Sequence, residues 1–116
     1  PTRRSSDLRI SQVLNNLISN AIKYGREKGN VFVGFSETEN TVLTEIADDG
    51  MGIAQEHLSR LFERFYRVDK ARSREKGGTG LGLSIVKHIL EAHGQVVNVR
   101  STVGIGTTFS FALKLG

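Results

Sequence analysis

A stripe of amide and basic side chains runs along the first amphipathic segment of the chain. Its members follow one another at steps of four, four and three residues: Gln12, Asn16, Asn20 and Lys23. A helix places residues so spaced on one face, and here that face borders the apolar one. A merely solvated face would more naturally use Glu and Lys, because asparagine is a poor helix former in mid-helix. The carboxamide oxygen of Asn20 is a hard neutral ligand and Lys23 adds a cation, a pair that suits a hydrated Mg²⁺ with its phosphates.

Two glycine-rich segments farther along could bring the backbone close to a ligand. The first, Asp48-Asp49-Gly50-Met51-Gly52, offers a carboxylate that can accept a hydrogen bond from an exocyclic amine, and glycines that let a flat base approach. Taken alone, such a segment is more often a tight turn than a site. The second, 77–83, opens a helical pattern, where glycine amides at a helix N-terminus can bind phosphate. It matches neither a P-loop nor a dinucleotide fingerprint.

The spacing of apolar residues predicts a two-layer α+β fold that would position these motifs. The expected elements are a helix over roughly 8–24, strands over 31–35 and 41–47 with a turn at 37–40, a helix over 83–93, and strands over 95–103 and 107–115. Gly94 is the expected C-terminal cap of the second helix. The polar and basic stretch 54–80 is too long for an ordinary connection, so we expect a functional loop or lid there.

Length and composition narrow the class of protein. A chain of 116 residues holds one domain, and 38% hydrophobic with 24% charged residues argues against wholesale disorder. The absence of cysteine excludes a disulfide framework and a thiolate metal site. No apolar run approaches the ~20 residues of a membrane span, and no signal-peptide core is present, so a cytoplasmic location is expected. The net charge of +4 is compatible with an anionic partner.

The first seven residues fit this pattern poorly. Residues 1–7 read Pro-Thr-Arg-Arg-Ser-Ser-Asp, with no apolar residue and no period. The string resembles the conceptual translation of a common sequencing adapter. We therefore expect a non-native or disordered arm over residues 1–7, followed by the functional domain over 8–116.

In their order along the chain, these motifs closely resemble the catalytic ATP-binding domain of sensor histidine kinases, in the superfamily that includes gyrase, Hsp90 and MutL-type ATPases. The matching segments are the N box at 16–24, the first glycine box at 48–53, the F box at 61–67, the second glycine box at 78–83 and the glycine-threonine segment at 104–109. The resemblance covers about residues 8 to 115. It implies a Bergerat-type two-layer sandwich, in which helices cover one face of a mixed, mostly antiparallel sheet.

The resemblance also implies a site for Mg-ATP. Asn20 would ligate Mg²⁺, Asn16 and Lys23 would support the metal and phosphates, Asp48 would bind the adenine amino group, and Arg67 is a candidate for the γ-phosphate. Thr107 would close on the base pocket or be a plain strand residue. The full set implied to hold the nucleotide is Asn16, Asn20, Lys23, Tyr24, Asp48, Gly50, Gly52, Ile53, Phe65, Gly78, Thr79, Gly80, Leu81, Gly82, Leu83 and Thr107, with Asn16, Lys23 and Arg67 as the catalytic members.

The resemblance implies partners as well. Hydrolysing relatives carry a water-activating glutamate where this chain has Asn16, which cannot take a proton near neutral pH. Phosphoryl transfer would therefore go to a docked histidine. The sequence around His57, His88 and His93 lacks the acceptor pattern, so the acceptor is expected on a separate dimerisation domain of the same kinase, for relay to a response regulator. The chain would then be a fragment of a kinase, and the parent kinase can carry a membrane anchor. Phe62 and Phe65 would form the docking patch, with ordinary core as the alternative for Phe62.

Three other functions stay open at this point. The chain could be an ATPase or serine kinase of the same superfamily, although Asn16 and the full F box argue against both. It could be a nucleotide sensor without transfer activity. The basic run 67–76 could bind nucleic acid, but it lacks interleaved stacking aromatics, so polyphosphate is the better partner and no nucleic acid is expected.

Overall fold

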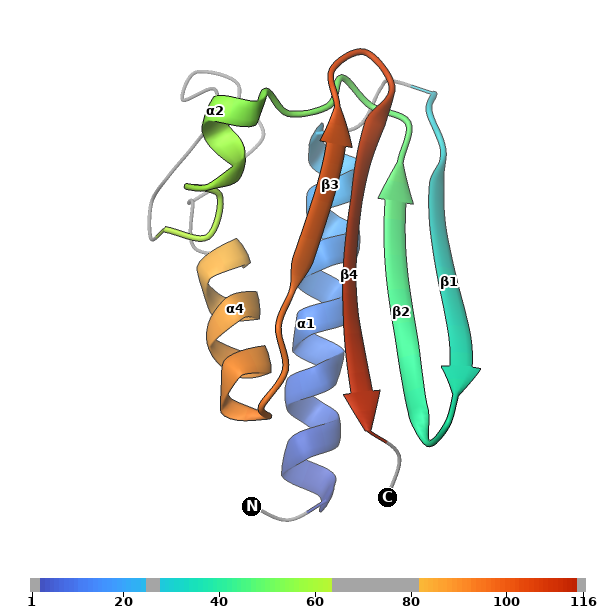
Figure 1. Cartoon of the computed structure of the whole chain (residues 1–116), viewed down its shortest axis with the longest axis vertical. Coiled ribbons are helices and arrows are strands. Elements are labelled where there is room, and N and C mark those ends of the chain that lie inside the picture. The colour runs from blue at the N-terminus through green and yellow to red at the C-terminus, as the bar shows by residue number, and fades with distance from the viewer. Residues whose placement is uncertain (1–2, 25–27, 64–81, 115–116) are drawn as a thin grey trace.

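The computed structural model describes residues 3–24, 28–63 and 82–114, with side chains from Arg9 onward and to Lys23 within the first helix (Figure 1). Its elements in chain order are α1 (Arg3–Tyr24), β1 (Val31–Thr38), β2 (Thr41–Asp48), α2 (Gln55–Leu58), α4 (Gly82–Ala92), β3 (Asn98–Thr102) and β4 (Gly106–Lys114).

Helix α1 begins earlier than its apolar period predicts. Residues 3–7 are helical, so for these five residues the structure differs from the disordered alternative that we expected. The physical reason is that extending an existing helix costs far less than nucleating one, and residues 3–7 contain no proline or glycine to stop it. The non-native origin of residues 1–7 stays an expectation.

Helix α4 ends as predicted at Gly94. This glycine has φ +71°, its amide donates to the carbonyl of Glu91 at 3.0 Å, and the amide of Gln95 donates to that of Leu90 at 2.8 Å. These two bonds form a Schellman motif, which satisfies carbonyls at the helix end.

The four strands form one sheet in the order β1-β2-β4-β3. A two-residue turn joins β1 and β2, with positive φ at Glu39 and Asn40, as the right-handed twist of a hairpin favours. Every pairing among the described strands is antiparallel, so the mixed character that we expected is not found in this part of the chain. The α+β class is confirmed.

The core lies between the sheet and the helices. Figure 1 shows α1 running behind the sheet with α4 beside it. Alternate residues of β2 and β4 face these helices, and the buried apolar side chains are Val13, Leu17, Ala21, Ile46, Leu61, Val86, Ile89, Leu90, Phe109 and Phe111. Phe62 packs edge-on against Phe109, with ring centroids 6.2 Å apart. This contact favours the core alternative for Phe62.

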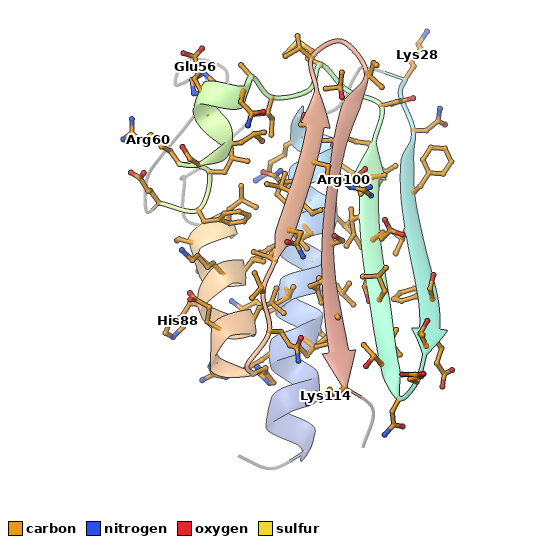
Figure 2. The ribbon with its side chains drawn as sticks, in the orientation of Figure 1. Lys28, Glu56, Arg60, His88, Arg100 and Lys114 are labelled. Carbon is orange, nitrogen blue, oxygen red and sulfur yellow. The ribbon has the colours of Figure 1, made fainter. Side chains whose placement is uncertain are left out.

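The other face of the sheet carries mostly polar side chains, with Phe32 and Leu43 exposed among them. Arg100 of β3 reaches Glu45 of β2, with guanidinium nitrogen and carboxylate oxygen 3.2 Å apart (Figure 2). The Arg100 side chain is 74% exposed and the Glu45 side chain 38% exposed, so solvent screens this ion pair and it contributes little to stability.

Candidate functional site

The N box, the first glycine box and the glycine-threonine segment gather at one end of the sheet. Figure 1 shows the C-terminal end of α1, the end of β2 and the β3–β4 turn at this end of the molecule. The strand register explains the gathering, because Asp48 pairs with Thr107, and Thr107 pairs with Ser101. These three residues form a row across β2, β4 and β3, in phase with the buried Ile46 and Phe109. The row therefore lies on the helix-covered face.

Asp48 is a half-buried carboxylate held by backbone amides. The amide of Gly50 donates to its Oδ1 at 2.8 Å, and the amide of Thr107 is a second donor. Burial raises the pKa of the Asp48 carboxyl above its ordinary value, and the charge of Asp49 adds to the rise. The two amide hydrogen bonds oppose this rise without cancelling it. The Asp48 carboxylate is thus kept in the fold although its burial costs free energy, and its remaining lone pairs can accept hydrogen bonds from a ligand.

The loop after β2 packs directly on the β3–β4 turn. The amide of Gly104 donates to the carbonyl of Met51 at 2.7 Å, and the amide of Ile53 donates to Ser101 Oγ at 2.7 Å. At Gly52 the φ is +76°, and a Cβ would overlap the carbonyl of Thr102. Gly52 is thus required by the approach of two backbones, a reason other than the room for a base inferred from sequence.

This close approach predicts the effect of one methyl group. Gly52→Ala should lower the free energy of unfolding by about 2–3 kcal/mol, because it adds backbone strain and forces the loop off the turn. Gly34→Ala is the control, since a Cβ there meets nothing within 4 Å. Denaturant unfolding of both variants measures the difference. Equal stabilities would show that the loop does not rest on the turn.

Asp49 connects the loop after β2 to the residue that precedes β1 by two hydrogen bonds. Its Oδ1 accepts from the amide of Asn30 at 2.8 Å and its Oδ2 accepts from Asn30 Nδ2 at 3.1 Å. Asn30 immediately precedes β1, so this pair ties the start of β1 to the end of β2. The second residue of the first glycine box therefore has a structural role here.

The amide stripe of α1 is present as predicted. Asn16, Asn20 and Lys23 are half-buried, whereas Gln12 at the beginning of the stripe is exposed. Among the described residues, Asn16 Nδ2 is the one buried side-chain nitrogen or oxygen without a hydrogen-bond partner. A buried donor left unpaired is costly, and an acceptor oxygen from a ligand would satisfy it.

Several expected site residues lie outside the described part of the chain. These are Arg67, Phe65, Gly78, Thr79, Gly80 and Leu81, together with the expected lid over most of its length; for Tyr24 only the backbone is described. Gly82 and Leu83 are described, and they begin α4 as the second glycine box predicts.

The histidines have the places expected of structural residues. His93 lies at the end of α4, with its Nδ1 2.8 Å from the carbonyl oxygen of Ile89. His88 is exposed and points away from the sheet (Figure 2). His57 of α2 lies 3.8 Å from the carboxylate of Glu56.

Sequence reasoning missed Ser101. Its signal was available, because Ser101 stands in phase with Val99 on the covered face of β3, close to the closing glycine-threonine segment. A polar residue at an inward position needs a hydrogen-bond partner, and that need marks it for attention.

These features define an α+β domain of the ATPase type. A glycine turn and a carboxylate lie at one end of the sheet, and asparagines lie on the helix that covers one face of the sheet. The chain belongs to the histidine kinase-, DNA gyrase B-, and HSP90-like ATPase family, whose model matches residues 5–116. No helix in the described ranges is both long and apolar enough to cross a membrane.

The chain is similar to several sensor histidine kinases. The chain is 47% identical over 107 residues to the sensor histidine kinase WalK of Bacillus subtilis, covering 90% of this chain and 18% of WalK. It therefore spans about a fifth of the length of the curated relatives. Among solved structures, full-length ShkA in complex with AMPPNP superposes with a TM-score of 0.77 at 35% identity, over 90% of this chain and 21% of ShkA. The catalytic domain of the histidine kinase ThkA also has a TM-score of 0.77, at 30% identity over 92% of this chain and 66% of that one.

Proposed function

We propose that the chain binds Mg-ATP and transfers the γ-phosphoryl group to a histidine on a separate acceptor domain of the same kinase, for relay to a response regulator. The matched kinases support this proposal by name, and the AMPPNP complex of ShkA supports an adenine nucleotide as ligand. Because ATP is a cytoplasmic substrate, we place the domain in the cytoplasm.

The observation that carries the proposal is the half-buried Asp48 carboxylate with a raised pKa. Two backbone amides orient it, yet burial still outweighs them, so the fold keeps an ionisable acceptor where a neutral residue would be more stable. Perturbed carboxyls of this kind are concentrated at functional sites. An exocyclic amine, such as that of adenine, would donate to a lone pair of Asp48 that the two amides leave free.

The amide stripe of α1 suits the phosphate end of the nucleotide. Asn16 Nδ2 is a donor without an acceptor, which a phosphate oxygen would satisfy. Asn20 offers a neutral oxygen of the kind that Mg²⁺ accepts beside phosphates and water, and the ammonium of Lys23 adds positive charge. When bound, Mg²⁺ neutralises charge on the phosphate oxygens. Asn20 is the residue that we assign to hold it.

Transfer then depends on placement. An imidazole nitrogen of the acceptor forms a bond to the γ-phosphorus while the bond from that phosphorus to the bridging oxygen breaks, and ADP leaves with the electron pair. Asn16 cannot take a proton from water, so hydrolysis gains no general base from this residue. Positioning and charge stabilisation account for most catalysis of phosphoryl transfer.

The test mixes this chain with Mg-ATP and the histidine-bearing domain of a matched kinase such as WalK. Acid-labile, alkali-stable phosphate on the acceptor is the expected result, and an acceptor with its histidine replaced by glutamine is the control. ATP binding without transfer, where the catalytic domain of WalK phosphorylates the same acceptor, would identify a nucleotide sensor instead.

A further inference from the structure

We propose that Ser101 is a positioning residue that sets the base selectivity of the nucleotide site through the Thr107 hydroxyl; this inference rests on the proposed function. Ser101 belongs to none of the motifs that predicted the site. It reaches the site through the row that β2, β4 and β3 form at one end of the sheet, where Thr107 stands between Asp48 and Ser101.

Within the described ranges, Ser101 Oγ has three polar neighbours. It accepts from the amide of Ile53 at 2.7 Å, it lies 3.0 Å from the carbonyl oxygen of Gly106, and it lies 2.8 Å from Thr107 Oγ1. The structure therefore joins, through one hydroxyl group, the loop after β2 and the first two residues of β4.

The chemistry of these neighbours fixes the direction of each hydrogen bond. A carbonyl oxygen can only accept, so the single proton of Ser101 goes to Gly106. Thr107 must then donate its own proton to Ser101 Oγ, because Ser101 has none left to give. In the described part of the chain, Thr107 Oγ1 has no other hydrogen-bond partner. What remains on that oxygen are lone pairs, so toward a ligand it acts as an acceptor.

Two acceptors therefore stand side by side, namely the Asp48 carboxylate and the Thr107 hydroxyl oxygen. A base that presents an amine at this edge can satisfy them. A base that presents a carbonyl meets lone pairs and is rejected. Without the Ser101 hydroxyl, Thr107 can rotate and donate, so the rejection of a carbonyl weakens.

The experiment compares ADP with IDP, whose hypoxanthine carries a carbonyl where adenine carries its amine; the diphosphate of purine riboside, which has neither the amine nor a proton on N1, controls for the N1 proton of hypoxanthine. Calorimetry gives the dissociation constants for the wild type, Ser101→Ala and Ser101→Thr. Ser110→Ala on β4 is the matched control, because Ser110 is half-buried but lies in phase with the opposite face of the sheet. We expect Ser101→Ala to narrow the preference for ADP by about 3- to 10-fold, as expected for one hydrogen-bonding group, and Ser101→Thr to restore it.

The outcomes distinguish a Ser101 that orients the Thr107 hydroxyl from a Ser101 that only stabilises the fold. The proposal would be overturned if Ser101→Ala left the ratio of the ADP and IDP dissociation constants unchanged, whether or not both affinities fell. It would also be overturned if Ser101→Thr failed to restore the preference for ADP. If Ser101→Ala does not fold, Ser101→Cys takes its place, because it preserves size but bonds weakly. Hydrogen exchange at the Ile53 amide gives a readout without nucleotide. Faster exchange in Ser101→Ala supports the network, and unchanged exchange overturns it. Wild-type protein that binds no ADP would instead refute the proposed function.

Discussion

Asn20→Ala should reduce Mg²⁺-dependent phosphoryl transfer by about 100-fold or more, the usual cost of removing one group that stabilises transition-state charge. The substitution removes the neutral oxygen that we assign to the metal, while Asp48 and the glycine turn remain. Binding of nucleotide without Mg²⁺ should therefore change little. The measurement is the initial rate of acceptor phosphorylation at several Mg²⁺ concentrations, with calorimetry of ADP alone beside it.

Two further variants sharpen this test. Asn20→Asp retains an oxygen ligand, so part of the activity should remain at high Mg²⁺. Gln12→Ala changes an exposed side chain at the start of the same stripe and should leave transfer unchanged. Transfer by Asn20→Ala at the wild-type rate would remove Asn20 from the metal site.

Asp48→Asn should weaken adenine nucleotides by on the order of 1–3 kcal/mol, because an amide in place of the carboxylate mismatches the base amine. Calorimetry with ADP measures the loss. Asp49→Asn is the matched control. It removes the charge of the neighbouring carboxylate, which accepts hydrogen bonds from Asn30. Unchanged ADP affinity in a folded Asp48→Asn variant would remove Asp48 from the site.

The same substitution should not lower stability at neutral pH. Burial raises the pKa of Asp48 in the native state, so the native state binds its proton more tightly than the unfolded chain does. The contribution of this group to stability therefore falls as pH rises from the ordinary carboxyl pKa through the raised one. Asp48→Asn removes this fall. Urea unfolding of wild type and variant between pH 3 and pH 7 checks the sign, and a variant less stable at pH 7 but not at pH 3 would contradict it.

Local signals in the sequence predicted most elements because each has a local cause, but α2 lies in the stretch that we expected to be a loop, and β1 continues to Thr38, into the expected turn. The period of α4 and its C-terminal cap at Gly94 follow from apolar spacing and a left-handed glycine. Of the two turn residues with positive φ, Asn40 is of a type that favours this conformation and Glu39 is not. The start of α1 was placed five residues late, because an apolar period marks the buried part of a helix and not its exposed extension.

The arrangement of the site was less accessible from the sequence. Register between strands distant in sequence decides that Ser101 lies beside Thr107, and no local pattern encodes that register. Likewise, glycine at 52 could be read as room for a ligand, whereas in the structure the neighbouring backbone fills that space. The ligand types on α1 were readable because asparagines in mid-helix contradict helix propensity and so indicate another role.

The interlock between the loop after β2 and the β3–β4 turn has a consequence for the kinetics of binding. Gly52 and Gly106 each let one backbone rest on another, and Ser101 and Gly104 add hydrogen bonds across the junction. This junction, which forms one side of the base site, is preorganised by these contacts. An incoming base therefore has little conformational entropy to remove from it. We therefore expect the rate of association to be limited by diffusional encounter. Substitutions at this junction that lower the affinity should do so by raising the rate of dissociation.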